Sequence, residues 1–148
     1  MNVSSALTID AIADTDVEPV VALWQRCGLT RPWNDPHADI ALARRRDNST
    51  ILIGRDGGAI VATVMVGYDG HRGWIYYVAV DPDCRKRGLG RVIMAAAEDW
   101  LRQAGISKLQ LLVRRENAQA NAFYQSLGFE ESTSVMFQKW LDGRDPTS

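Results

Sequence analysis

The sequence predicts an α/β (α+β) protein in which a mostly antiparallel sheet is flanked by helices. Three observations predict it. Segments with one apolar helical face alternate with β-rich segments, glycine-rich turns join consecutive strand-like segments, and the sequence contains no internal repeat. No low-complexity tract or linker divides the 148 residues, of which 46% are apolar and 24% charged. We therefore expect one globular domain over residues 1–148, with about 7–141 ordered.

The first part of the chain should contain one strand and two helices. A strand is expected over Leu7–Asp10, followed by a helix whose apolar residues between 17 and 24 recur at i, i+3, i+4 and i+7. Thr15 or Asp16 is the candidate N-cap of that helix. Two prolines then end the helical pattern, and a second helix is expected near Ala38–Arg46.

The middle of the chain should form the centre of the sheet. Ile51–Gly54 and Ile60–Tyr68 are rich in β-branched residues, and the turn residues Asp56-Gly57-Gly58 between them favour an antiparallel hairpin. Trp74–Val80 is apolar on both faces, as expected of a central strand. The remaining expected elements are a helix over Val92–Ala104, a strand over Lys108–Val113, a helix over Ala118–Leu127 and a last strand over Ser134–Leu141.

Composition argues against several classes of function. Seventeen basic and eighteen acidic residues give a net charge of −1, which excludes a nucleic-acid binder that relies on overall positive charge. The two cysteines, Cys27 and Cys84, lack metal-ligand spacing, and neither lone histidine supports a metal site. Because no stretch is long and apolar enough for a membrane span and no export signal is visible, we expect a cytoplasmic protein with no membrane partner.

Basic residues gather around two glycines between the central strand and the helix that follows it. Four of the seven positions are basic in the segment Arg85, Lys86, Arg87, Gly88, Leu89, Gly90 and Arg91. Glycine lets a ligand approach the backbone closely, and the N–H groups at a helix N-terminus attract anions. The segment therefore favours a phosphate site, although the same glycines could simply shape a tight turn on a solvated basic surface. Ile93 replaces the third glycine of the dinucleotide fingerprint G-x-G-x-x-G, which argues against that type of site.

Two motifs in this half of the chain resemble the signature of the GNAT superfamily of N-acetyltransferases. The acetyl-CoA loop of that family, R/Q-x-x-G-x-G/A, is matched by Arg85, Gly88 and Gly90. The family segment N-x-x-A-x-x-F-Y-x-x-x-G-F is matched by Asn117, Ala120, Phe123, Tyr124, Gly128 and Phe129. The first half of the chain resembles the YpeA-like bacterial branch of the family in three segments, Leu23-Trp24, Arg31–Pro36 and Gly67–Gly73.

The resemblance implies a fold and an activity. The fold is a mixed, mostly antiparallel sheet of six or seven strands, in which a bulge near Val78 splays the fourth strand from the fifth. The activity is transfer of an acetyl group from acetyl-CoA to a primary amine by direct attack on the thioester, with CoA as product. The pantetheine would pair with Val78, Ala79 and Val80 like a strand, the Val80 N–H would polarise the thioester carbonyl, and residues Arg85 to Arg91 would hold the pyrophosphate.

The second motif supplies the candidate acid. Tyr124 falls at the position where many family members place the group that protonates the leaving thiolate, although it could instead be a half-buried aromatic residue with a structural hydroxyl. Asn117, Ala120 and Phe123 would contact the cofactor in the family arrangement. Asn117 could equally cap the following helix, and Phe123 could belong to the core.

No family position supplies an obvious general base. Trp74–Val80 contains no acidic residue, and Leu112 stands where enzymes that acetylate ribosomal protein N-termini carry an acid, so both the histone-type and the ribosomal-type assignments are in doubt. The remaining candidates are Asp35, Asp69, His71, Tyr76 and a water chain. The reference pKa of histidine near neutrality favours His71, which could also be an exposed turn residue.

The acceptor is expected to be a small-molecule or peptide amine. Acidic groups would attract a protonated amine and aromatic faces suit cations, so the candidate residues are Trp33, Asn34, Asp35, Tyr68, Asp69, His71, Trp74 and Tyr76. All of them could also have purely structural roles. Two other functions stay open, a non-catalytic acyl-CoA-binding sensor or interaction module and a generic anion-binding domain. A second copy of the chain is a further candidate partner.

Overall fold

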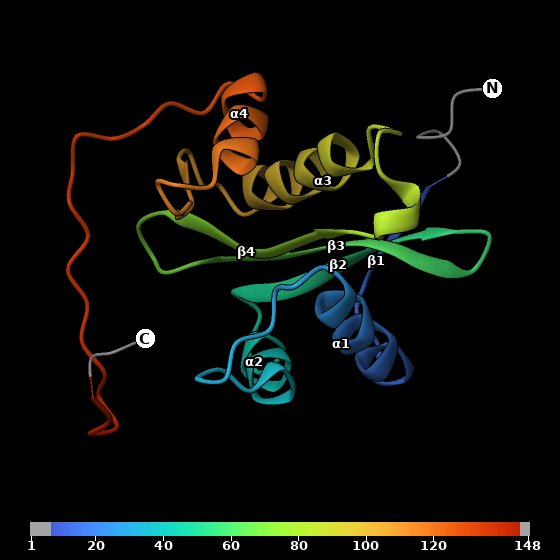
Figure 1. Ribbon diagram of the computed structural model, residues 1–148, viewed down its shortest axis with the longest axis horizontal. Helices are drawn as coiled ribbons and strands as arrows, with labels where there is room; N and C mark the ends of the chain where they lie inside the picture. Colours follow the sequence, from blue (N-terminus) through green and yellow to red (C-terminus); the bar gives the residue numbers. More distant parts are fainter. Residues whose placement is uncertain (1–6, 146–148) are drawn as a thin grey trace. The chain divides into compact units, whose positions relative to one another are not determined.

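The computed structural model describes residues 7–145, which form a mixed sheet flanked by helices (Figure 1). The α/β class and the mostly antiparallel sheet predicted from the sequence are confirmed. Two compact units are distinguished, one ending at Leu112 and the other beginning at Val113. The elements are β1 (Thr8–Ala11), η2 (Asp14–Asp16), α1 (Val17–Arg26), α2 (Pro36–Ala43), β2 (Ser49–Asp56), β3 (Ala59–Tyr68), β4 (Gly73–Val80), η3 (Pro82–Cys84), α3 (Leu89–Gln103), β5 (Leu109–Gln110) and α4 (Ala118–Ser126).

The strands lie side by side in the order in which they occur in the chain, β1-β2-β3-β4-β5. The first four are antiparallel, and Ile53 of β2 lies opposite both Asp10 of β1 and Thr63 of β3. Only β5 pairs in parallel, through two residue pairs with the start of β4. The hairpin between β2 and β3 is the predicted one, and its turn residues Gly57 and Gly58 have φ values of 58° and 92°, which favour glycine.

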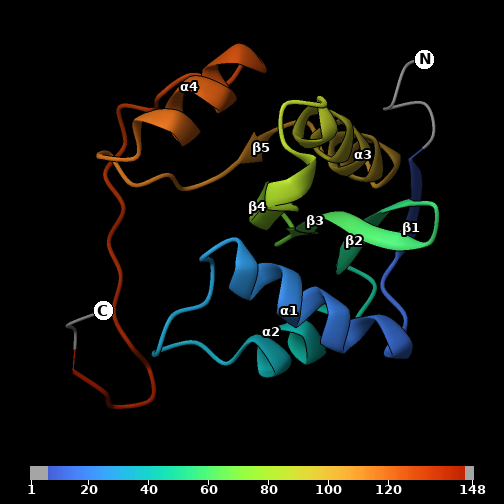
Figure 2. The same cartoon turned by 45° about the vertical axis from the view of Figure 1, so that its right-hand side comes forward.

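Helices cover both faces of the sheet. Helix α3 packs on one face, and α1 and α2 lie on the other (Figures 1 and 2). On the α3 side the sheet approaches the helix so closely that a Cβ atom at Gly73 would lie 2.6 Å from the Cδ1 atom of Leu101. Glycine at this position therefore sets the distance between α3 and β4. None of the helices within residues 7–145 is long and apolar enough to cross a membrane.

The core between the sheet and α1 is built from the apolar stripe predicted for that helix. Val20, Leu23 and Trp24 are completely buried, together with Ile51 and Ile53 of β2. Complete burial of an aliphatic side chain of this size contributes about 1.5–3 kcal/mol to folding. Burial of this cluster therefore stabilises the packing of α1 against the sheet.

A partly buried ion pair fixes the start of α1. The carboxylate of Asp16, the N-cap residue, accepts a hydrogen bond from the Ala13 N–H (2.8 Å) and lies 2.7 Å from the guanidinium of Arg55 on β2. The hydrogen bond from Arg55 is the main reason that the pKa of Asp16 is lowered, and the Ala13 N–H adds to the effect. Of the two predicted cap residues, Asp16 occupies the N-cap position, but its side chain makes no capping hydrogen bond to α1.

The structure differs from the sequence expectations at three places. The strand predicted over Ser134–Leu141 is wrong, because no ladder partner pairs with this segment within residues 7–145 and Phe137 is 94% exposed. The strand expected over Lys108–Val113 is confined to Leu109–Gln110, because only these two residues pair with β4. The described sheet has five strands, whereas six or seven were expected. Helix α2 begins at Pro36, because Asp35 caps it, and ends at Ala43.

Candidate active site

A bulge interrupts β4 next to the residues expected to pair with the cofactor. Thr63 of β3 lies opposite Ala79, whereas Met65 lies opposite Tyr76, so β4 contains one extra residue between these two pairs. Tyr77 lies in this bulge with φ +52°, a left-handed conformation that is uncommon for a residue other than glycine. The bulge near Val78 that the family resemblance implied is therefore present, one residue earlier.

Beyond the start of β4, one edge of the strand has no ladder partner in the described part of the chain. The pairing with β5 consists of Gly73 with Leu109 and Trp74 with Gln110, and it ends there. The expected separation of the fourth and fifth strands is confirmed. Edge backbone groups between Ile75 and Val80 can therefore pair with an extended ligand.

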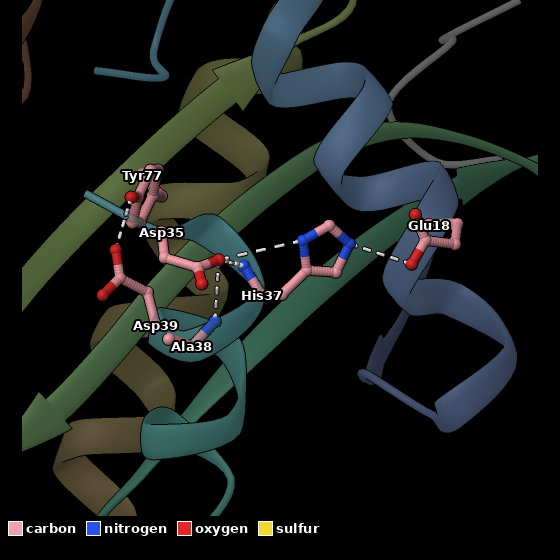
Figure 3. Close-up of polar contacts among 6 residues, drawn as sticks. All are labelled: Glu18, Asp35, His37, Ala38, Asp39 and Tyr77. Atoms are coloured by element: carbon pink, nitrogen blue, oxygen red, sulfur yellow. Dashed lines mark hydrogen bonds and ion pairs between the residues drawn. The ribbon is translucent and has the colours of Figure 1, made fainter. Parts of the chain in front are cut away.

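Tyr77 is held by three side chains from three different elements. Its ring is stacked on that of Trp24, with centroids 3.8 Å apart and planes 7° from parallel. Its carbonyl accepts a hydrogen bond from the Thr63 hydroxyl (3.1 Å), and its own hydroxyl donates to Asp39 (2.7 Å; Figure 3). Burial, followed by the bond to Asp39, raises the pKa of Tyr77 far above its usual value, so the phenol stays protonated.

Sequence reasoning overlooked this cluster. Trp24 was assigned only to the helix stripe, and Tyr77 appeared as one more apolar residue of a central strand. The available signal was a tyrosine in a strand that is otherwise nearly all apolar, because a buried phenol needs a polar partner. Asp39 supplies that partner from the first turn of α2.

The segment after β4 is anchored by Asp81. Its carboxylate accepts a hydrogen bond from the Asp83 N–H (2.9 Å) and pairs with Arg26 of α1 at 3.0 Å. The Asp83 N–H, helped by Arg26, lowers the pKa of Asp81. The thiol of Cys27 donates to the Val80 carbonyl (3.3 Å). Two consecutive residues at the end of α1, Arg26 and Cys27, therefore bond to the end of β4 and to the residue that follows it.

The N-terminus of α3 has no side-chain cap. Gly88 is the N-cap residue, its φ is +75°, and no acidic residue occupies the first turn. Asp35 caps α2 with its carboxylate and Asn117 caps α4 with its side-chain oxygen, whereas α1, like α3, has no side-chain capping bond. Space around Gly88 is open, since an added Cβ would meet nothing within 4 Å. Uncapped first-turn N–H groups beside open space fit an anionic ligand such as a pyrophosphate.

The basic residues of the loop divide into two groups. Arg85, Lys86 and Arg91 are exposed, and Lys86 has φ +67°. Arg87 instead lies 2.8 Å from Asp56, whose hydrogen bond raises the pKa of its guanidinium. Leu89 is buried, which anchors the start of the helix in the core. The predicted phosphate loop thus has three exposed cations, while Arg87 is paired with an acid.

The α1–α2 side holds the first group of acceptor candidates. Asp35 accepts hydrogen bonds from the N–H groups of His37 (3.0 Å) and Ala38 (3.3 Å), which shows the structural role of this carboxylate (Figure 3). The His37 Nε2 atom lies 2.9 Å from Glu18 of α1. Trp33 is half-buried and Asn34 is exposed in the preceding loop. These residues therefore lie on the face that carries Tyr77.

The turn before β4 brings a second group together. The Asp69 carboxylate accepts from the N–H groups of Arg72 (2.8 Å) and His71 (2.9 Å) and from the indole N–H of Trp74 (3.2 Å). The Arg72 N–H, followed by that of His71, lowers the pKa of Asp69. Burial, together with the charge of Asp69, raises the pKa of Tyr76, which is 49% exposed. His71 itself is an exposed turn residue.

Tyr124 and Asn117 lie in the second unit. Asn117 accepts from the Ala120 N–H at 3.0 Å, so its capping role is observed. The Tyr124 ring makes edge contacts with Phe123 (5.0 Å between centroids) and Phe129 (5.8 Å). Burial raises the pKa of Tyr124, which favours the protonated phenol.

Comparison with known proteins identifies the family. The sequence profile of the acetyltransferase (GNAT) family matches residues 11–129. The chain belongs to this family. An acetyltransferase of Yersinia enterocolitica is 39% identical over 135 residues, which cover 91% of this chain and 96% of the relative. An acetyltransferase of Yersinia pestis is 40% identical over 126 residues, covering 85% and 89%.

Solved structures show the same GNAT fold. The ribosomal-protein-S18-alanine N-acetyltransferase of Escherichia coli is 29% identical, covers 93% of this chain and 87% of its own, and superposes with a TM-score of 0.75. An aminoglycoside N-acetyltransferase solved with CoA is 21% identical, covers 91% and 95%, and has a TM-score of 0.78. As a GNAT family member, this protein is an acetyltransferase.

Proposed function

We propose that this GNAT protein transfers the acetyl group of acetyl-CoA to a primary amine by direct attack of the amine on the thioester. The observation that carries the proposal is the continuity of β4 with the glycine loop. The strand provides a bulge and an edge with no ladder partner among the described residues, and it leads through η3 and the glycine loop to a helix N-terminus without a side-chain cap. The family match spans residues on both sides of Leu112, which supports one catalytic domain.

The residues present suit CoA as a ligand. Leu89, Gly90 and Arg91 contribute the first-turn N–H groups of α3, and the exposed cations of the loop add positive charge for the pyrophosphate. The edge of Val78–Val80 would pair with the pantetheine, and the Val80 N–H would donate to the thioester carbonyl. When bound, acetyl-CoA supplies the activated acetyl group.

Tyr124 is proposed as the acid that donates a proton to the leaving sulfur. Its raised pKa keeps the phenol protonated at neutral pH, which is the state a donor requires. Asn117, Ala120 and Phe123 would lie against the cofactor, with Asn117 also capping α4.

The acceptor is proposed to be a small-molecule or peptide amine. Asp69, Trp74 and Tyr76 offer a carboxylate with a lowered pKa next to two aromatic rings, a combination that attracts cations. The lowered pKa also makes Asp69 a weak base, so the Asp69 carboxylate is better suited to binding the amine than to deprotonating it. Asp35 is similarly engaged with the start of α2. His71, Tyr76 and a water chain are the candidates left for removing the proton.

Thiol release across a panel of amines tests this function. Free CoA should accumulate only when acetyl-CoA and a suitable amine are both present, and mass spectrometry should find the acetylated amine. Tight calorimetric binding of acetyl-CoA without transfer to any amine would instead indicate a sensor or interaction module. Absence of binding would leave a generic anion site, and the Gly88→Trp variant serves as the control that blocks the loop.

A cytoplasmic location and a homodimer stay predictions, and analytical ultracentrifugation tests the homodimer.

A further inference from the structure

The bulge in β4 depends on a residue that would not adopt its backbone conformation unaided. A non-glycine residue in the left-handed region costs about 1–2 kcal/mol, and it persists only where surrounding contacts compensate. Tyr77 has φ +52°, and its neighbours Tyr76 and Val78 flank the extra residue of the strand. The contacts of Tyr77 must therefore supply the compensation.

Those contacts form one connected chain of side chains. The indole N–H of Trp24 donates to the Thr63 hydroxyl at 2.9 Å, and that hydroxyl donates in turn to the Tyr77 carbonyl at 3.1 Å. Trp24 also stacks on the Tyr77 ring, so it holds the residue both directly and through Thr63. Trp24 and Thr63 are completely buried, and water cannot replace either bond without entering the core.

The chain continues into helix α2. The Tyr77 hydroxyl donates to Asp39 at 2.7 Å (Figure 3), and the Asp39 N–H donates to the Asp35 carbonyl at 2.9 Å. Asp35 is the N-cap of α2 and follows the loop that contains Trp33 and Asn34. The bulge on the proposed donor side and the first turn of α2 on the proposed acceptor side are thus joined through one phenol.

We propose that Trp24, Thr63 and Asp39 form a lock that holds Tyr77 in its left-handed conformation and thereby directs the outward-facing N–H groups at the end of β4, that of Val80 among them, toward the acetyl donor. Tyr77 is a positioning residue, because its backbone shapes the strand edge while its side chain faces α1 and α2. This proposal rests on the proposed function only in taking acetyl-CoA as the ligand.

A matched pair at Thr63 tests the lock. Thr63→Val keeps the side-chain shape but removes the hydroxyl, whereas Thr63→Ser keeps the hydroxyl. We expect Thr63→Val to weaken calorimetric binding of acetyl-CoA about tenfold or more, because two buried partners lose their bonds. Thr63→Ser should retain most of the affinity. The backbone Cα and Cβ NMR shifts of Tyr77 in the ligand-free protein should leave the left-handed range in Thr63→Val only.

A second pair separates positioning from general stability. Tyr77→Gly and Tyr77→Ala both lose the ring and the hydroxyl, but only glycine adopts a positive φ without strain. A lock that acts through backbone direction predicts that Tyr77→Gly binds acetyl-CoA more tightly than Tyr77→Ala, although glycine makes the free chain more flexible. A purely structural role predicts equal acetyl-CoA affinity for the two variants when binding is measured at a temperature at which both are fully folded.

The outcomes are distinct from those that test the proposed function. If the unmodified protein fails to bind acetyl-CoA, the proposed function fails, and the Tyr77 shifts in Thr63→Val and Thr63→Ser still decide whether the lock exists. Unchanged Tyr77 shifts in Thr63→Val would overturn the lock. Equal acetyl-CoA affinity of Thr63→Val and the unmodified protein would overturn its link to the donor site.

Discussion

The guanidinium of Arg87 lies 2.8 Å from the Oδ2 atom of Asp56, which ties the glycine loop to the turn between β2 and β3. Both side chains are partly exposed, at 28% and 37%. Surface pairs of this kind contribute about 0–1 kcal/mol to stability. The main consequence is therefore electrostatic, because the charge of Arg87 is largely balanced before any anion reaches the loop.

This pairing predicts unequal contributions from the loop arginines. Arg91→Ala should raise the KM for acetyl-CoA several-fold at low salt, because it removes an exposed cation from the first turn of α3. Arg87→Ala should change the KM by about twofold or less, since its charge is already balanced by Asp56. Steady-state kinetics at two salt concentrations measures both effects. A larger effect of Arg87→Ala would show that Arg87 leaves Asp56 for the cofactor.

Gly88 should be required for cofactor binding beyond its effect on stability. Gly88→Ala and Gly105→Ala both place a Cβ at a positive φ, +75° and +80°, with nothing within 4 Å to clash. Each should cost about 1 kcal/mol of unfolding free energy, measured by urea denaturation. Only Gly88→Ala should also weaken acetyl-CoA binding, because Gly105 lies at the opposite end of α3. Equal binding by the two variants would argue against close approach of the ligand at Gly88.

Tyr124→Phe tests the proposed acid. Removing the hydroxyl while keeping the ring should lower kcat by about 100-fold or more, the usual contribution of a general acid, and should leave the KM for acetyl-CoA nearly unchanged. The edge contacts with Phe123 and Phe129 remain possible in this variant, so the melting temperature should change little. Turnover equal to that of the unmodified enzyme would remove Tyr124 from the mechanism.

The Asp16–Arg55 pair predicts an acid-dependent loss of stability. Because the pKa of Asp16 is lowered in the folded protein, its contribution is complete above the unfolded value of 3.8 and is lost as the pH falls below it. Asp16→Asn should therefore destabilise the protein at neutral pH by about 1–3 kcal/mol, and the difference should shrink below pH 3.8. Asp14→Asn is the control, because the Asp14 carboxylate is 93% exposed. Urea denaturation across this pH range would contradict the prediction if the two variants behaved alike.

Local patterns were sufficient to predict most of the fold. The stripe that includes Val20 and Trp24 predicted α1, and Gly57 and Gly58 predicted the turn of the hairpin, because each pattern reflects contacts close in sequence. The strand over Ser134–Leu141 failed for the opposite reason, since β-propensity indicates a segment suited to pairing but does not supply the partner.

The glycine loop was predictable, whereas the environment of the loop and of the bulge was not. Gly88 could be recognised from the sequence because its conformation needs glycine. The ion pair of Arg87 with Asp56 and the bond of Tyr77 to Asp39 join residues 31 and 38 positions apart, and no local pattern marks such pairs. The raised pKa of Tyr124 likewise follows from burial that only the folded chain provides.

The order of the strands also bears on how the protein folds. Because each strand lies next to the one that precedes it in the chain, the antiparallel part of the sheet can form by successive additions, with β2, β3 and β4 joined by short turns. Contacts between segments close in sequence form fastest, since little loop-closure entropy is lost. We therefore expect the three-stranded meander from β2 to β4 to form early in folding, and the parallel addition of β5 to be a late step.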